Sequence, residues 1–243
     1  MGQLRYLLTL PVATVHHSMR AALAGLRGER FQPGGVYDDA PRAWSRSILK
    51  AAGVRVDVSG LEHLPSDQAC VIVSNHNSFM DVWVLAAALP GSVRFIAKQE
   101  LFRIPLLGRA MRASGQISID RSQLRSAMGA YDDAIARLRE GISPVIFAEG
   151  TRSRTGALQS FKKGPFVLAI AAQVPVVPVY IAGSREVLPP GSMRVRPGTI
   201  SLRIGQPIPT AGLTHDDRDR LSARARAAME SLAASVDAIP AED

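Results

Sequence analysis

Hydrophobic and polar positions follow two different periods along this chain, and the two alternate from residue 54 onward. Short apolar or alternating runs predict strands, and longer runs with an apolar residue every three or four positions predict helices. The predicted strands are 54–58, 69–74, 93–97, 116–120, 144–148, 176–181 and 199–204. The predicted helices are 79–89, a short helical region over 101–113, 123–139, 163–172, and a last helix that Thr214 and Asp217 cap and that ends near 236. This alternation predicts an α/β fold with an open, mostly parallel sheet flanked by helices.

The first 53 residues have a different pattern, with two predicted helices and no strand. The first helix carries an apolar stripe, continued more weakly to residue 26, at Leu4, Leu7, Leu8, Val12 and Val15. The second helix is predicted to begin at Pro41 and to end at Gly53. We therefore expect a two-helix segment over 1–53 and an α/β domain over 54–243, whose motif-bearing core is at about 69–184.

Positive charge is concentrated in this first segment. Residues 1–55 hold eight basic and three acidic residues, which gives +5 of the formal net charge of +8. Basic residues beside an apolar helical face predict docking on an anionic membrane surface. The alternative is that both helices only pack on the α/β domain. Nucleic acid is not an expected partner, because aromatic content is 5% and no basic stretch is interleaved with aromatic residues.

Two uncharged runs are candidates for membrane spans. The run 6–19 has 14 residues and contains Pro11, so it is too short to cross a bilayer. The run 164–184 contains three prolines, which fit a helix followed by a buried strand better than a span. We predict no transmembrane span. The single cysteine, Cys70, excludes an internal disulfide and suits a reducing compartment.

The most informative polar stretch follows the strand predicted at 69–74. His76 and Asp81 are five residues apart, about 500° of helical rotation, so they do not share a helix face. They can meet if His76 lies on the turn before the helix and Asp81 lies in its first turn. The carboxylate would then hold one imidazole nitrogen and leave the other as a general base. Alternatively, Ser78 and Asp81 form a capping box and His76 is an ordinary loop histidine.

Further polar clusters also come directly after predicted strands. They are Lys98, Arg121 and the segment Glu149-Gly150-Thr151-Arg152-Ser153. If the strands are parallel, these clusters and His76 lie along one edge of the sheet, where open α/β folds bind ligands. Each cluster alone is compatible with a solvated charge or, for Glu149 and Arg152, with a local ion pair. Four clusters at the same edge predict a functional site.

Six sequence blocks carry a resemblance to a known family. They are His76-x4-Asp81, Lys98-x-Glu100-Leu101 with Pro105 and Gly108, Gly115-x-Ile-x-Ile-Asp120-Arg121, Glu149-Gly-Thr-Arg152-Ser153, Phe161-Lys162-x-Gly164 and Val174-Pro-Val-Val-Pro178. In order and spacing they resemble the motifs of the glycerolipid acyltransferases, the 1-acyl-sn-glycerol-3-phosphate acyltransferase family. The resemblance covers about residues 50–205. The first 50 residues are similar in character to the two-helix membrane-docking segment of bacterial members.

This resemblance implies transfer of an acyl chain from a thioester to the sn-2 hydroxyl of 1-acyl-sn-glycerol-3-phosphate, which gives phosphatidate. His76 would be the general base, and Asp81 would orient its ring. The substrate-binding residues implied are Lys98, Arg121, Glu149, Gly150, Thr151 and Arg152. Among them, the cations would bind the acceptor phosphate, and Glu149 would orient the glycerol hydroxyl or hold Arg152. Backbone N–H groups of residues 77–80 are expected to stabilise the oxyanion, and residues 174–178 are expected to form the floor of the site.

The same resemblance sets the expected partners. The acyl donor is acyl-CoA or acyl carrier protein, and no metal or other cofactor is expected. The protein is expected to be membrane-associated, peripheral or monotopic, on the cytoplasmic face of the inner or plasma membrane. Two alternatives remain: an acyltransferase for another acceptor, such as lyso-ornithine lipid, and a lipid-binding protein without catalytic activity on the same fold.

Overall fold

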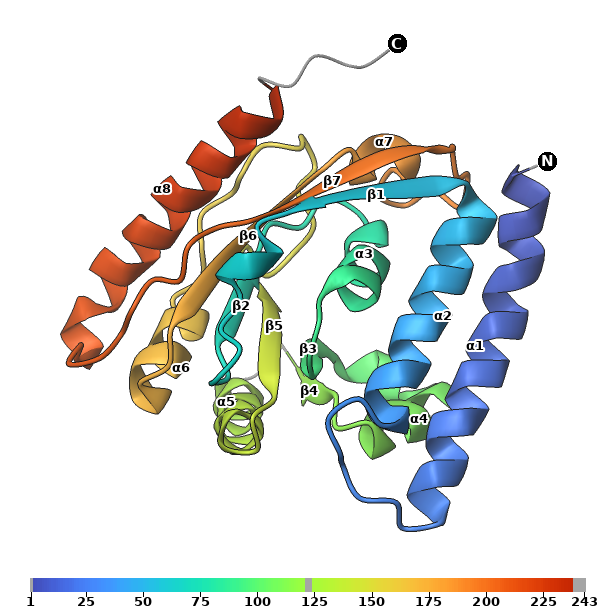
Figure 1. The fold of residues 1–243 in the computed structure, drawn as a ribbon, viewed down its shortest axis with the longest axis horizontal. Helices are drawn as coiled ribbons and strands as arrows, with labels where there is room; N and C mark the ends of the chain where they lie inside the picture. Colours follow the sequence, from blue (N-terminus) through green and yellow to red (C-terminus); the bar gives the residue numbers. More distant parts are fainter. Residues whose placement is uncertain (1, 121–123, 238–243) are drawn as a thin grey trace.

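The computed structural model describes residues 2–120 and 124–237, and within them seven strands form one sheet (Figure 1). The strands are β1 (Val54–Ser59), β2 (Val71–Ser74), β3 (Val93–Lys98), β4 (Ile117–Ile119), β5 (Ser143–Phe147), β6 (Val176–Ala182) and β7 (Gly198–Ile204). Their order is β1-β7-β6-β2-β5-β3-β4, and every neighbouring pair is parallel except β6 with β7. The prediction of an open, mostly parallel α/β sheet is confirmed.

Helices cover both faces of this sheet (Figure 1). Those on the face of the first core cluster are α1 (Gly2–Leu26), α2 (Val36–Ala52), α3 (Met80–Ala88) and the short α7 (Ser184–Val187). The opposite face carries α5 (Leu124–Arg139), α6 (Gly164–Ala172) and α8 (Arg218–Asp237). The remaining elements are α4 (Leu107–Ala113) and the 3-10 turns Leu61–His63, Gln99–Arg103 and His215–Asp217. The helices predicted after residue 54 are all present, whereas α7 was not predicted.

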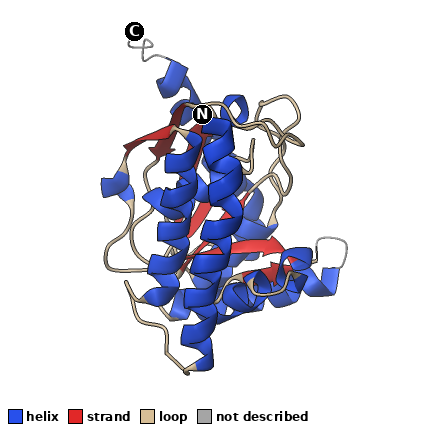
Figure 2. Cartoon of the chain, turned by 90° about the vertical axis from the view of Figure 1, so that its right-hand side faces the viewer, coloured by secondary structure: helices blue, strands red, loops and turns tan. Residues whose placement is uncertain are grey.

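The two N-terminal helices run side by side (Figure 2). The second begins at Val36, five residues before the predicted start at Pro41, which lies inside the helix. Two carboxylates in its first turn, Asp38 and Asp39, favour a helix start there because they face the positive end of the helix dipole. The predicted end is confirmed: Gly53 has φ 70°, and its N–H bonds to the carbonyls of the last turn.

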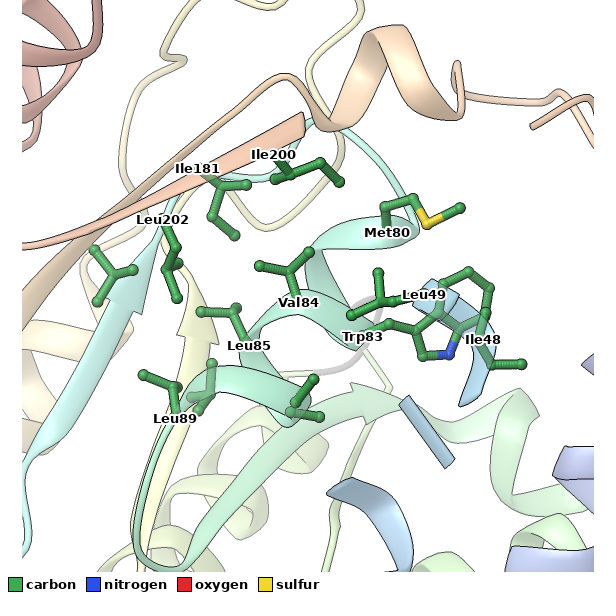
Figure 3. Close-up of a cluster of buried hydrophobic side chains, with 14 of the residues drawn as sticks. Ile48, Leu49, Met80, Trp83, Val84, Leu85, Leu89, Ile181, Ile200 and Leu202 are labelled. Carbon is green, nitrogen blue, oxygen red and sulfur yellow. The ribbon is translucent and has the colours of Figure 1, made fainter. Parts of the chain in front are cut away.

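A hydrophobic cluster joins the two N-terminal helices to the sheet through α3 (Figure 3). Figure 3 labels Ile48, Leu49, Met80, Trp83, Val84, Leu85, Leu89, Ile181, Ile200 and Leu202. Trp83 lies near the centre of this junction, with edge-to-face contacts to Tyr6 of α1 and Trp44 of α2. The helix that starts beside His76 is therefore packed directly on the N-terminal pair.

The apolar stripe of α1 faces solvent instead of this core. Among the described residues, eight of the thirteen exposed large hydrophobic side chains belong to it: Leu4, Leu7, Leu8, Val12, Val15, Met19, Leu23 and Leu26, which are 39–76% exposed. The opposite face of α1 is the packed one and carries Tyr6 and Ala13. Within the described part of the chain, no helix combines the length and the apolar character that crossing a membrane requires.

Candidate active site

The turn between β2 and α3 brings His76 and Asp81 together. The imidazole Nδ1 of His76 lies 2.8 Å from Asp81 Oδ2, and the same oxygen accepts the backbone N–H groups of Asn77 at 2.7 Å and Ser78 at 2.8 Å. The Asp81 side chain is 0% exposed and that of His76 is 12% exposed. Three N–H donors on one buried oxygen stabilise the charged carboxylate, which in turn favours a hydrogen on Nδ1. The contact with Asp81 uses Nδ1 of His76 and does not involve Nε2.

The main chain of His76 is held on both sides by the segment after β5. Its N–H donates to Glu149 Oε1 at 3.0 Å, and its carbonyl accepts the N–H of Ser153 at 2.7 Å. The second Glu149 oxygen accepts the N–H of Gln159 at 3.2 Å. The Glu149–Ser153 block therefore fixes the backbone of the histidine across two neighbouring strands.

Phe147, the last residue of β5, supports the imidazole from one face. The two ring centroids are 3.8 Å apart with an interplanar angle of 13°. A stacked aromatic ring restricts rotation of the imidazole, which the hydrogen bond to Asp81 holds at its edge. Position and orientation of the ring are thus both set by neighbours.

The carboxyl of Glu149 is a buried acid in this cluster. Burial raises its pKa above the ordinary value, while the N–H donors of His76 and Gln159 act in the opposite direction. Within the described residues, Glu149 forms no salt bridge with Arg152, whose side chain is exposed. Its two carboxylate oxygens accept the backbone N–H groups of His76 and Gln159. The contact of Glu149 with a substrate hydroxyl stays a prediction.

The prediction that the backbone N–H groups of residues 77–80 stabilise the oxyanion is wrong for three of these four groups. The N–H groups of Asn77 and Ser78 bond to Asp81, and the N–H of Met80 bonds to the Ser78 hydroxyl at 3.1 Å. The turn uses these donors to hold the aspartate and to bind the Ser78 hydroxyl, so they are not directed at a ligand. The predicted capping box is not complete: the Asp81 carboxylate accepts the Ser78 N–H, but the Asp81 N–H bonds to the Ser78 carbonyl and not to its hydroxyl.

Of the predicted cationic residues, the two that the structure describes, Lys98 and Arg152, lie at the same edge of the sheet. The strands β2, β5, β3 and β4 are consecutive neighbours and parallel, so their carboxyl ends meet at one edge. Lys98 is the exposed last residue of β3, and Arg152 lies exposed after β5. Arg121 lies outside the described residues. Thr151 is exposed, and Gly150 has φ 74°, a left-handed conformation that favours glycine.

A further residue, Asn75, was missed by the sequence analysis. Its side-chain amide donates to the carbonyl of Ile181 at 2.9 Å and accepts the N–H of Ile181 at 2.8 Å. It therefore extends the pairing of β2 with β6 by one residue, directly before His76. Phe147 was missed as well, although an aromatic residue at the end of a predicted strand was an available signal. Neither the Asn75 contact nor the Phe147 contact follows from the spacing of residues in the sequence.

Residues 174–178 do not form the floor of the site. The register pairs Val176 with Val71 and Pro178 with Val73, so this segment begins at the opposite end of the strands from His76. Its residues from 175 to 178 are buried in the sheet. Among the described residues, no group of three or more His, Cys, Asp or Glu side chains is placed to hold a metal ion.

The fold and the site define an α/β protein in which a buried aspartate holds a histidine ring at the carboxyl edge of the parallel part of the sheet. The chain belongs to the acyltransferase family: the family model described as Acyltransferase matches residues 55–182, more than half of the chain.

Relatives of similar sequence are acyltransferases by name. Human 1-acyl-sn-glycerol-3-phosphate acyltransferase alpha is 37% identical over 178 residues, which are 73% of this chain and 63% of that protein. The chloroplastic 1-acyl-sn-glycerol-3-phosphate acyltransferase BAT2 of Brassica napus is 40% identical over 156 residues, 63% of this chain and 45% of its own. This chain spans less than two thirds of the length of these two relatives. The human beta protein is 35% identical over 199 residues, 82% of this chain and 72% of its own.

A solved structure matches the whole chain. The crystal structure of the 1-acyl-sn-glycerophosphate (LPA) acyltransferase PlsC from Thermotoga maritima superimposes with a TM-score of 0.81 at 26% sequence identity, and the match covers 100% of both chains. The match therefore includes the N-terminal helices as well as the sheet.

Proposed function

We propose that this protein is a 1-acylglycerol-3-phosphate O-acyltransferase of phospholipid biosynthesis, which transfers a fatty acyl chain to the sn-2 hydroxyl of lysophosphatidate and forms phosphatidate. The observation that carries the proposal is the fixed ring of His76. Asp81 binds Nδ1, Phe147 covers one face, and the backbone is clamped on both sides, so that Nε2 remains for a substrate proton. A site that only binds lipid has no need of such a base.

The transfer follows from this geometry. Nε2 of His76 takes the proton of the acceptor hydroxyl as its oxygen attacks the thioester carbonyl, and Asp81 stabilises the imidazolium that forms. The tetrahedral intermediate then expels the thiolate, which takes the proton back from the imidazolium. The products are phosphatidate and a free thiol, and His76 returns to its neutral state. Cys70 is no alternative nucleophile, because burial raises the pKa of its thiol to about 11 and it lies at the far end of β2.

The acceptor phosphate is assigned to the cations at the carboxyl edge of the sheet. Lys98 and Arg152 are exposed there, and Arg121 follows β4 in sequence. Lys162 joins them: its side chain lies within 3.4 Å of the position that a Cβ of Gly150 would take. A guanidinium is suited to a two-point grip on phosphate, so we assign the main phosphate contact to Arg152.

Membrane docking is the proposed role of the two-helix segment 1–53, which precedes the catalytic α/β domain over 54–243. The exposed apolar stripe of α1 would lie in the interface of the cytoplasmic leaflet, and the surrounding basic residues would bind anionic head groups. The acceptor is itself a membrane lipid, so docking would bring the protein and its acceptor to the same surface. The acyl donor is acyl-CoA or acyl carrier protein, and both are substrates, so the reaction as proposed needs no cofactor.

An acceptor panel tests the proposal. Purified protein with one labelled acyl-CoA is offered lysophosphatidate, lyso-ornithine lipid and glycerol-3-phosphate, and the lipid products are resolved. We expect phosphatidate, and we expect His76→Ala to lower its formation by the general-base factor of about 10²–10⁴. Transfer to lyso-ornithine lipid alone would reassign the acceptor. Lipid binding without transfer to any acceptor would instead identify the non-catalytic alternative.

The phosphate assignment has its own test. Arg152→Ala should weaken transfer to lysophosphatidate much more than transfer to an uncharged monoacylglycerol, because only the first loses a charge-assisted contact. The control is Arg139→Ala, which removes an exposed arginine of α5 on the sheet face that also carries α6 and α8. An equal loss for both acceptors would show that Arg152 is structural.

A further inference from the structure

A segment between α7 and β7, residues 188–197, lies beside the N-terminal end of α1 (Figure 1). Its side chains are divided between core and solvent: Val195 is buried at 4% exposure, whereas Met193 is 59% exposed and Arg194 and Arg196 are exposed. Arg194 and Arg196 flank the buried Val195 and are both exposed. The segment thus presents one large apolar side chain beside two cations.

Gln3 binds this segment to α1 at two points. Its amide Nε2 donates to the carbonyl of Met193 at 3.0 Å, and its Oε1 accepts the N–H of Val195 at 2.7 Å. The exposed Met193 is therefore held by Gln3 at the first turn of α1, where the exposed apolar stripe begins at Leu4. Pro197 of the same segment packs close to Gly2. Residues 188–197 thus lie against the N-terminal end of α1.

The charge of this surface has one sign. Residues 2–26 and 188–205 contain no acidic residue. In the described part of the chain, neither Arg194 nor Arg196 takes part in a salt bridge. The exposed Glu186 of α7 is adjacent to Val187, whose carbonyl accepts the Arg196 N–H, so one acidic residue borders this surface. Cations beside an apolar side chain are complementary to a bilayer whose head groups are anionic.

The base of the same segment reaches the catalytic turn. The Ser78 hydroxyl, 0% exposed, donates to the carbonyl of Leu188 at 2.6 Å, and the Ser78 N–H binds Asp81. The segment is thus hydrogen-bonded to α1 at one end and to the turn that carries His76 and Asp81 at the other.

We infer that residues 188–197 are a second membrane-contacting element. Met193 inserts beside the apolar face of α1, Arg194 and Arg196 bind lipid phosphates, and Gln3 holds both elements as one docking surface. The inference rests on the proposed membrane docking by α1 and adds a contact next to the catalytic turn. It commits to an anionic bilayer as the occupant.

A fluorescent label tests the insertion of Met193 in the full-length protein. Met193→Cys and Met128→Cys are each labelled with an environment-sensitive fluorophore and mixed with vesicles of phosphatidylcholine and phosphatidylglycerol. Met128 is a matched control, because it is 61% exposed and belongs to α5 on the opposite face of the sheet. Cys70 is buried and its thiol pKa is raised to about 11, so it stays unlabelled. We expect a blue shift and brighter emission at position 193 only. Equal responses at both positions would overturn the inference.

A charge test addresses the two arginines. We expect Arg194→Ala/Arg196→Ala to lower association with the anionic vesicles by about tenfold and to leave association with pure phosphatidylcholine unchanged. The control Arg139→Ala/Arg224→Ala removes the same charge from the opposite face of the sheet and should have little effect. Equal losses in the two double variants would overturn the inference.

Further outcomes separate this inference from the proposed function. Loss of vesicle binding in Leu8→Asp, together with a silent label at position 193, would reject the second contact and keep docking by α1. No vesicle binding by the unmodified protein would reject both. If Arg194→Ala/Arg196→Ala lowers transfer from acyl carrier protein but not from acyl-CoA, and the label stays silent, the segment binds the donor protein and the lipid assignment is wrong.

Discussion

Replacement of Asp81 by asparagine changes one atom at the centre of the site. The carboxylate oxygen Oδ2 accepts three N–H groups, and the other oxygen, Oδ1, is buried without a hydrogen-bond partner in the described part of the chain. An asparagine can keep its oxygen in the position of Oδ2. Its NH₂ group then occupies the position of Oδ1, where no acceptor is present.

The structure sets the size of two separate effects. An unsatisfied buried donor costs about 1–3 kcal/mol, so the free energy of unfolding of Asp81→Asn should fall by about that amount. The amide carries no charge and cannot stabilise the imidazolium of His76, a change that lowers kcat by about 10⁴ in histidine–aspartate pairs of hydrolytic triads. We therefore expect a modest loss of stability and a loss of kcat of about 10²–10⁴.

Two measurements on the same preparation separate the effects: urea unfolding, and kcat for phosphatidate formation per folded molecule. Asp38→Asn is the matched control. Asp38 is also buried and also accepts three donors, from Arg94 at 2.7 Å, Ser92 at 2.6 Å and Gly34 at 2.9 Å, but it belongs to α2 and not to the His76 turn. We expect the control to lose stability and to keep its kcat.

The reasoning would be refuted by either of two results. If Asp81→Asn keeps kcat within about tenfold of wild type, the charge of Asp81 does not support a base. If the control loses as much kcat per folded molecule as Asp81→Asn, the activity reports general packing and not the His76–Asp81 pair.

Three further predictions concern the supports of the histidine. Phe147→Leu removes the stacked ring and should lower kcat by about twofold to tenfold at unchanged KM, whereas Phe166→Leu, a core control, should affect stability only. Asn75→Leu leaves two buried backbone groups of β6 unpaired and should lower the free energy of unfolding by about 2–4 kcal/mol in urea titrations. Glu149→Gln should gain stability relative to wild type as pH rises above 4.5, because burial raises the folded-state pKa of Glu149 and wild type loses this contribution as that carboxyl ionises. A constant difference between the two unfolding curves across pH would contradict it.

Most of the elements, and the edge at which the polar clusters meet, could be predicted from the pattern along the chain. Periodicity reports how side chains point relative to their own helix or strand, so strand β2, helix α3 and the capped α8 could be predicted within a few residues. The alternation of strands and helices implied parallel strands, and parallel strands place their carboxyl ends together. His76, Lys98 and Glu149 were therefore expected at one edge before any contact was known.

Tertiary structure alone decided which neighbours support the histidine. β5 lies between β2 and β3 in the sheet, although it follows both in the chain, and this order brings Phe147 and Glu149 against His76. The direction of the apolar stripe of α1 is also decided by tertiary structure. An amphipathic sequence has the same period whether its stripe packs inward or faces outward. Local propensity acts over a few residues, whereas strand order and the exposure of a face depend on the packing of the whole chain. For that reason the spacing allowed the His76–Asp81 pair to be predicted, whereas the supports of His76 could not be predicted. The direction of the α1 stripe stayed open between membrane docking and packing on the α/β domain.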